Sequence, residues 1–340
     1  MPRIDGNYGE GGGQILRTGL TLACITGLPL ELHNIRAGRK KPGLRPQHLA
    51  CVRAAADICK AEVRGGEVGS RELYFLPKMA PKPGHYRWQI GTAGAATLVL
   101  QTVMLPLAMA PGPSAVHVEG GTHVPHSPTA HYLRDVYIPM LIQSGAEVEM
   151  HLERLGWYPK GGGALLLQTE GWAHLSGQNL LERGDLERVF GVGLASNLAA
   201  HIPQRLSDHS MRLLASLDVP VDIRVQRDGD AASPGAALCL AMEYANGRAG
   251  VSVLGEQGLP AENIAEEAAT GVMALAAGGA SVDAHLADQL VLLFALADGE
   301  SAFVTPYVTE HLRTNIWVIN RFIQRRISIH EKHGLVEIAG

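Results

Sequence analysis

The chain has 340 residues with 46% hydrophobic and 18% charged side chains, which is typical of a soluble globular protein large enough for two domains. Its net charge of −4 excludes a generally basic nucleic-acid coat but leaves room for a local basic patch. No apolar run is long enough to cross a bilayer, and acidic residues interrupt the segment where a signal peptide needs its apolar core, so we expect a cytoplasmic protein without membrane contact.

Taken in chain order, the predicted elements form a loose internal repeat. The first unit reads helix, strand, helix, strand, strand over residues 14–26, 30–35, 46–60, 61–64 and 73–76. The second begins with an additional strand and covers 86–90, 93–110, 115–119, 128–144, 147–151 and 164–169. The third repeats the order of the first over 285–297, 301–304, 309–323, 326–330 and 334–338. Coincidence among unrelated helix–strand units is the alternative explanation.

Residues 184–277 do not fit this repeat. They predict strand, helix, strand, strand, strand and helix over 189–194, 203–217, 221–225, 237–244, 250–253 and 260–276. Because this segment precedes the helix that opens the third unit, it indicates a small α/β domain inserted into that unit.

Cysteine and histidine side chains are the candidate metal ligands of the sequence. The four cysteines are Cys24, Cys51, Cys59 and Cys239. They form no CxxC pair and no metal-binding spacing, so we expect reduced, mostly buried thiols. His123, His126 and His131 cluster around two prolines and suggest zinc, but no cysteine or clear carboxylate lies in register with them. We therefore favour no metal at these histidines.

A glycine-rich turn at residues 9–13 precedes the first helix and contains Glu10. Free N–H groups at a helix start, next to glycines, form an anion site, and a carboxylate there can hold a divalent metal on a phosphate. A solvent-exposed glycine loop explains the same residues equally well.

Residues 36–45 form the densest basic patch of the chain. Arginine side chains match phosphate oxygens, and the Pro and Gly of this segment keep it from becoming helical. The patch suggests contact with a phosphorylated end or backbone. Without other observations, a solvated charged loop is the simpler interpretation.

His311 and Asp288 are polar residues on the two last predicted helices. Thr309 suits the N-cap of the final helix, which places His311 in its first turn, where the helix dipole favours a neutral ring and attracts phosphate. A neutral histidine facing a nucleoside triphosphate is a candidate nucleophile. Asp288 lies inside an apolar helix, where a buried carboxylate needs a partner. Surface positions on the two helices are the alternative.

The segment 154–163 combines an arginine, a Pro-Lys step and three consecutive glycines, and it resembles the signature of the RNA 3′-terminal phosphate cyclase family. The resemblance covers essentially the whole chain. Its other motifs lie at residues 5–6, 9–17, 35–43, 47–49, 98–102, 120–122, 287–290 and 311–316. The three glycines either cradle a ligand or allow close packing at the start of the last strand of the second unit, and we favour packing.

The resemblance implies an α+β fold of three repeated two-helix, four-strand units with a small α/β domain inserted in the third unit. The large, catalytic domain then covers residues 1–183 and 278–340, and the inserted domain covers 184–277. The family fold agrees with the repeat predicted from the residues.

The resemblance also implies an ATP-dependent ligase that acts on RNA with a 3′-phosphate end. His311 matches the histidine that attacks the α-phosphate of ATP, which releases pyrophosphate and leaves a histidine–AMP adduct. AMP then passes to the RNA 3′-phosphate, and the neighbouring 2′-hydroxyl expels it and closes a 2′,3′-cyclic phosphate. Magnesium or manganese is the implied metal, and a homodimer is left open.

The remaining site residues are carried over by position. Glu10 resembles the metal-binding carboxylate, and Asp288 resembles the carboxylate beside the nucleophile, which fixes its tautomer or helps to hold the metal. Residues that resemble polar groups around the phosphates and the RNA end are Arg17, Arg36, Arg39, Gln47 and Gln101. Pro128 and Tyr132 match positions that line the adenine pocket, where this chain carries His285 in place of a tyrosine.

Two other functions are compatible with parts of the sequence. A non-catalytic relative that binds RNA during ribosome assembly shares the fold but lacks the nucleophilic histidine, which His311 supplies here. An enolpyruvyl transferase is built from similar repeats, but it requires neither His311 nor the signature at 154–163. The sequence leaves open the physiological RNA, activity on 5′-phosphates or DNA ends, and the role of the inserted domain.

Overall fold

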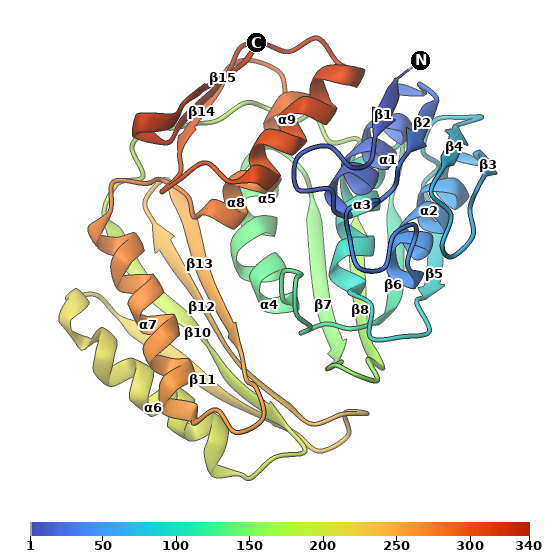
Figure 1. Ribbon diagram of the computed structural model, residues 1–340. Coiled ribbons are helices and arrows are strands. Elements are labelled where there is room, and N and C mark those ends of the chain that lie inside the picture. Colours follow the sequence, from blue (N-terminus) through green and yellow to red (C-terminus); the bar gives the residue numbers. More distant parts are fainter. Residues whose placement is uncertain (1) are drawn as a thin grey trace.

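Three four-stranded sheets of the protein share one strand order, and their helices meet in the middle of the molecule (Figure 1). The computed structural model describes residues 2–340. The first sheet has the order β1-β2-β4-β3, with β1 parallel to β2 and the remaining pairs antiparallel. Its elements are β1 (Arg3–Asp5), α1 (Gln14–Thr26), β2 (Leu30–His33), α2 (Pro46–Cys59), β3 (Glu62–Arg64) and β4 (Leu73–Leu76).

The second sheet repeats this order as β5-β6-β8-β7, again with the first pair parallel. Its elements are β5 (His85–Gln89), α3 (Ala96–Ala108), β6 (Ser114–Gly120), α4 (Ala130–Tyr132), the π-helical turn η1 (Leu133–Tyr137), α5 (Ile138–Gln143), β7 (Val148–Arg154) and β8 (Gly163–Thr169). Thus the single helix expected over 128–144 has a π-helical turn in its middle.

The third sheet has the order β9-β14-β16-β15, and its first pair is parallel as well. Its elements are β9 (Asn179–Leu180), α8 (Ala284–Leu296), β14 (Ser301–Val304), α9 (Glu310–Phe322), β15 (Ile327–His330), the short 3-10 turn η3 (Glu331–His333) and β16 (Leu335–Ile338). The chain leaves this sheet after β9 and returns to it at α8 and β14. The repeat read from the residues missed β1 and β9, which have only three and two residues.

Helices of the three units pack against one another between the sheets. One continuous cluster of buried apolar side chains includes Leu20 of α1, Val99 of α3, Leu290 of α8 and Val318 of α9. Burying a side chain of this kind contributes about 1.5–3 kcal/mol, so the shared core holds the first and last parts of the chain together. The N-terminus of α1 and the N-terminus of α9 are thereby kept near each other.

The fourth sheet, β11-β10-β12-β13, lies between β9 and α8 in the chain. Its elements are β10 (Leu186–Ser196), α6 (His201–Leu214), η2 (Ala215–Leu217), β11 (Val221–Asp228), β12 (Gly235–Tyr244), β13 (Gly247–Leu254) and α7 (Ala261–Ala277). Helices α6 and α7 cover one face of this sheet (Figure 1), and Leu206, Leu238 and Val272 belong to a separate apolar cluster there. The other face contacts α4 and η1.

The glycines of segment 154–163 lie in the connection between β7 and β8, where backbone packs on backbone. A Cβ on Gly156 would lie 2.4 Å from Gly120 O, and one on Gly161 would lie 2.8 Å from Thr92 O. Neither position tolerates a side chain without displacing main chain. These glycines do not line the main cavity described below, so their contacts support the packing interpretation.

The fold also bears on the expectations about membrane-spanning segments and cysteines. Across residues 2–340, no helix combines the length and the apolar composition needed to cross a membrane. The four cysteines, all within the described residues, are free and buried, as expected.

Candidate active site

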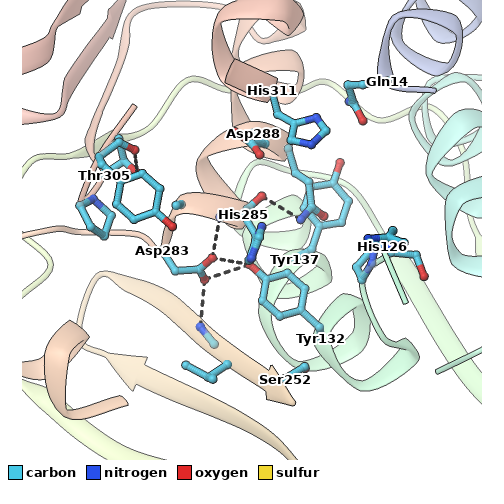
Figure 2. A pocket seen from close by; sticks show the side chains of 18 of the residues that line it. Gln14, His126, Tyr132, Tyr137, Ser252, Asp283, His285, Asp288, Thr305 and His311 are labelled. Atoms are coloured by element: carbon cyan, nitrogen blue, oxygen red, sulfur yellow. Dashed lines mark hydrogen bonds between the residues drawn. The ribbon is translucent and has the colours of Figure 1, made fainter. Parts of the chain in front are cut away.

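A cavity of about 1640 Å³ opens between the central helices and the fourth sheet. Every residue predicted above for catalysis, nucleotide binding or metal binding lines it. These residues are Glu10, Arg17, Arg36, Arg39, Gln47, Gln101, Pro128, Tyr132, His285, Asp288 and His311. Figure 2 shows that the labelled side chains reach the cavity from different elements, with His311 and Gln14 at one end and Tyr132 and Ser252 at the other.

Glu10 lies in the turn before α1, and two glycines make room for the groups around it. A Cβ on Gly12 would lie 2.0 Å from Glu10 Oε1. A Cβ on Gly13 would lie 2.5 Å from His48 Nε2 and 2.7 Å from Arg17 Nη1. A side chain at either position would displace these polar groups, which explains the glycines of the turn.

Two arginines bring positive charge to the Glu10 carboxylate. Arg39 Nη2 lies 2.6 Å from Glu10 Oε2 and also donates to the Glu10 carbonyl at 2.7 Å. Arg17 Nη2 donates to Gln14 Oε1 at 2.7 Å. Burial lowers the pKa of Arg17, but a guanidinium stays charged in proteins. The two side chains therefore form a cationic wall that suits phosphate oxygens.

Arg36 organises the basic loop of residues 36–45. Its backbone is left-handed, with φ of 54°, and its Nη1 donates to the carbonyls of Lys41 at 2.8 Å and Gly43 at 3.3 Å. Burial and the neighbouring Arg39 lower the pKa of Arg36. Arg36 and Arg39 line the cavity, whereas the exposed Lys40 and Lys41 do not, so only part of the basic patch faces the site.

His311 stands in the first turn of α9, as the sequence predicted. Thr309 Oγ1 caps the helix by accepting the Leu312 N–H at 2.9 Å. The ring Nδ1 of His311 lies 3.6 Å from Glu10 Oε1. Burial lowers the pKa of His311, and the charge of Arg17 adds to this effect, against the opposing charge of Glu10. The ring is therefore neutral at pH 7 and retains a nitrogen lone pair.

Asp288 is a buried carboxylate whose partner is the capping residue of α9. Thr309 Oγ1 donates to Asp288 Oδ1. Burial raises the pKa of Asp288 to about 7, and the charges of Asp283 and Glu10 add to this rise. The carboxylate next to a ring nitrogen of His311 is that of Glu10, whereas Asp288 supports the turn from which His311 projects.

A chain of hydrogen bonds links α1, α8 and α9 beneath the cavity, and the sequence analysis missed it. Asn315 Nδ2 donates to the Asp288 carbonyl at 2.7 Å, while its Oδ1 accepts from Gln14 Nε2 at 3.0 Å and from Thr18 Oγ1 at 2.7 Å. Asn315 is fully buried, and a buried amide requires such partners. Asn315 lies four residues after His311 and therefore on the same face of α9, and this spacing could have identified Asn315 as a residue of the site.

His48 also lines the cavity and had no assigned role. Its Nδ1 accepts the Arg45 N–H at 3.1 Å, which leaves the proton of the neutral ring on Nε2. Burial and the positive charges of Arg17, Arg36 and Arg45 lower the pKa of His48 to about 3. His48 is therefore a neutral N–H donor next to Gly13.

The other end of the cavity depends on Asp283, a residue that the sequence analysis passed over. Tyr132 donates its hydroxyl to Asp283 Oδ1 at 2.8 Å and Oδ2 at 2.9 Å. Asp283 also accepts the N–H groups of Gly250, His285 and Leu286, so one carboxylate joins β13, α4 and the start of α8 (Figure 2). An Asp before an apolar run is a common N-cap signal.

The remaining predicted residues have protein partners of their own. Gln101 Nε2 donates to Gln289 Oε1 at 2.6 Å, and Gln47 Oε1 accepts the Ala95 N–H at 3.2 Å at the start of α3. His285 lies near Tyr132 in Figure 2, and Pro128 lines the same cavity.

The three clustered histidines separate in the fold. His126 lines the cavity, whereas His123 and His131 lie behind it and face each other, with Nε2 of His123 2.8 Å from Nδ1 of His131. No cysteine lies in register with these histidines along the sequence, but in the fold Cys239 of β12 lies beside both rings. A strand more than 100 residues later in the chain supplies this thiol, so spacing in the sequence could not reveal it.

A family model described as RNA 3′-terminal phosphate cyclase matches residues 8–329. An RNA 3′-terminal phosphate cyclase from Trichormus variabilis is 46% identical and covers 100% of this chain and 99% of its own length. Proteins of the same description from Methylococcus capsulatus and Pyrobaculum aerophilum are 44% and 40% identical, over 99% of this chain and 96% and 98% of theirs.

Proposed function

The chain belongs to the RNA 3′-terminal phosphate cyclase family, and we propose that it converts the 3′-terminal phosphate of an RNA into a 2′,3′-cyclic phosphate with consumption of ATP. The observation that carries the proposal is the neutral ring of His311 beside Glu10 in a large cavity that Arg17 and Arg39 also line. A nucleophile surrounded by phosphate-binding cations suits nucleotidyl transfer.

The first step is attack of His311 on the α-phosphorus of ATP. The Glu10 carboxylate, 3.6 Å from Nδ1, favours the tautomer with the proton on that nitrogen. The Nε2 lone pair then forms the N–P bond, the P–O bond to the β-phosphate breaks, and pyrophosphate leaves. The carboxylate stabilises the positive charge that develops on the ring, as the acidic partner of a catalytic histidine does.

The cations of the site bind and orient the phosphates. Arg17, Arg36 and Arg39 line the cavity with guanidinium groups, and the first turn of α9 adds free backbone N–H groups near His311. Neutral His48 adds an N–H donor without adding charge. Charge that builds on the leaving pyrophosphate is thereby stabilised in place.

A divalent cation such as Mg²⁺ or Mn²⁺ fits the Glu10 side of the cavity as a companion of the triphosphate. Glu10 Oε1 accepts no hydrogen bond from the residues described, and no set of three acidic or histidine ligands surrounds it. Mg²⁺ commonly binds through one or two carboxylates and the substrate phosphates, so one carboxylate is sufficient. When bound, the cation would neutralise phosphate charge.

The later steps transfer AMP and close the ring. An oxygen of the RNA 3′-phosphate attacks the phosphorus of the adduct, the N–P bond breaks, and His311 regains its lone pair. The 2′-hydroxyl oxygen then attacks the RNA phosphorus, its proton is lost, and AMP leaves. Because AMP is a better leaving group than an oxide of the terminal phosphate, the consumption of ATP makes cyclisation possible.

The base of ATP occupies the end of the cavity near α4 and α8. Tyr132 offers a ring fixed by Asp283, and Pro128 offers an apolar contact. His285, at a position that we associate with tyrosine in the family, stacks on the base in the same way. Gln101, tied to Gln289, supplies a polar contact nearby.

We further propose that the three similar sheets and their helices form one catalytic domain, residues 1–183 and 278–340, and that 184–277 is a separate inserted domain with its own apolar core. A role as a non-catalytic RNA-binding relative is disfavoured, because the nucleophile His311 lines the cavity.

The test is formation of a covalent protein–AMP adduct. The protein is incubated with ATP labelled at the α-phosphate and with Mg²⁺ or Mn²⁺, without RNA. We expect a labelled protein whose bond is labile in acid and stable in base, as expected for an N–P bond. His311→Ala and the more conservative His311→Asn should both abolish the label, while His330→Ala, a change of an exposed histidine outside the cavity, should not.

Two results would contradict the proposal. Absence of label in the wild-type protein would exclude the adenylylation mechanism. Label that persists in His311→Asn would leave the mechanism but reject His311 as the nucleophile. When the labelled wild-type protein is given an RNA with a 3′-phosphate, we expect release of AMP and formation of a cyclic phosphate at the RNA end.

A further inference from the structure

We propose that His123, His131 and Cys239 form a binding site for a thiophilic divalent cation of the Zn²⁺ type, separate from the phosphate cavity. The three side chains are buried, and their ligand atoms all lie within 4.8 Å of one another. None of the three lines the main cavity. The inference stands independently of the function proposed above.

The donor set has the composition that zinc prefers. Two imidazole nitrogens and a thiolate are typical Zn²⁺ ligands, with bonds of about 2.0–2.1 Å to nitrogen and 2.3 Å to sulfur. Tetrahedral geometry at these lengths separates two ligand nitrogens by about 3.3 Å. Nε2 of His123 and Nδ1 of His131 are 2.8 Å apart, so the rings need to separate by about half an ångström, and the cation replaces the hydrogen bond between them.

The orientation of His123 is fixed by a second hydrogen bond. Its Nδ1 lies 2.9 Å from Thr122 Oγ1, and the same hydroxyl oxygen accepts the Gly156 N–H at 2.9 Å. A histidine that ligates a metal usually uses its other ring nitrogen in this manner, which sets the tautomer. With the proton on Nδ1, the Nε2 lone pair points toward His131 and is available to a cation.

Oxygen donors for a fourth coordination position lie next to the cluster. A narrow gap, too small to admit a water molecule, is lined by His131 and Cys239 together with Asp135 and Ser252. Asp135 accepts from Arg134 through both carboxylate oxygens at 2.7 Å. A movement of either Asp135 or Ser252 toward the cluster would supply the fourth ligand of a tetrahedral set.

The three ligands come from both sides of the contact between the second and the fourth sheet. His123 follows β6, His131 belongs to α4, and Cys239 lies on β12, whose sheet packs against α4. The Trp157 ring lies 5.1 Å from that of His123, and its Nε1 donates to Ser196 of β10 at 2.8 Å. A cation at this place therefore joins the fourth sheet to the rest of the protein, as structural zinc does elsewhere.

The experiment supplies the metal while the protein folds, because the buried ligands are closed to solvent in the folded protein. The full chain is expressed with added Zn²⁺ or Co²⁺ and dialysed against a weak chelator. We expect about one Zn²⁺ per chain by elemental analysis, and a sulfur-to-cobalt charge-transfer band in the Co²⁺ form. Cys239→Ser should remove both signals. Two control variants should keep the band. Cys51→Ser changes another buried thiol, and Glu10→Ala removes the carboxylate that lines the phosphate cavity.

Several outcomes would overturn the inference. If wild-type protein expressed with Co²⁺ lacks the thiolate band, the site does not exist. The three side chains then form a hydrogen-bonded cluster only. A band that survives Cys239→Ser places the thiolate elsewhere. If Cys239→Ser does not fold, removal of zinc from the wild-type protein with a strong chelator decides the matter: an unchanged unfolding midpoint would reject a structural cation, and a lower midpoint would support it.

Discussion

The buried carboxylate of Asp288 gives the native state a pH-dependent weakness that can be measured. Burial raises its pKa from the usual 3.8 to about 7, although Thr309 and the Leu312 N–H both stabilise the charged form. Between these two values the folded protein binds a proton that the unfolded chain releases. Stability therefore falls as the pH rises from about 4 to about 7, and it is constant with respect to this group above and below that window.

The magnitude follows from the size of the pKa difference. One pKa unit corresponds to 1.36 kcal/mol, so the rise from 3.8 to about 7 corresponds to about 4 kcal/mol. Asp288→Asn removes the ionisation but keeps an oxygen that can accept the hydrogen bond from Thr309. We expect the stability difference between the variant and the wild type to grow in favour of Asn by about 4 kcal/mol from pH 4 to pH 8.

The assay is urea unfolding of both proteins at several pH values between 4 and 8. All other titrating groups are common to the two proteins, so the difference between the curves isolates Asp288. Parallel curves across the whole range would refute the reasoning, because they would mean that Asp288 ionises as it does in the unfolded chain. An Asp298→Asn control, which changes an exposed carboxylate, should leave the pH profile unaltered.

Three further predictions concern the cavity. Gly12→Ala places a Cβ 2.0 Å from Glu10 Oε1, so the Glu10 carboxylate must move. We expect the rate of adduct formation to fall about tenfold or more while the far-ultraviolet circular dichroism spectrum is unchanged. A normal rate would contradict the role of Glu10. Tyr132→Phe removes the hydroxyl that donates to Asp283 and should cost about 1.5–3 kcal/mol in urea unfolding, a loss that an unchanged midpoint would disprove. Because burial lowers the pKa of His311, the rate of adduct formation should stay constant as the pH falls to 6.5 and decline only in more acidic buffer. A decline that begins above pH 6.5 would argue against a neutral, buried ring.

Local signals in the sequence were sufficient for most of the helices and strands. Thr309 before α9 predicted both the start of the helix and the position of His311 in its first turn. Two of the three shortest strands, β1 and β9, were missed because two or three residues carry too little periodicity, and their extended form depends on pairing with β2 and β14. The π-helical turn η1 was missed for a similar reason, since its residues continue an ordinary helical pattern.

The candidate site also has features that local sequence indicates and features that only the tertiary structure reveals. The sequence by itself indicated which residues carry the chemistry, because glycines before a helix, clustered arginines and a capped histidine are recognisable from their immediate neighbours. Only the tertiary structure decided that Glu10, rather than Asp288, lies next to the ring of His311, that Asp283 holds Tyr132, and that Cys239 joins His123. These contacts join distant parts of the chain, and they depend on how the central helices and the fourth sheet pack, which no local pattern of residues encodes.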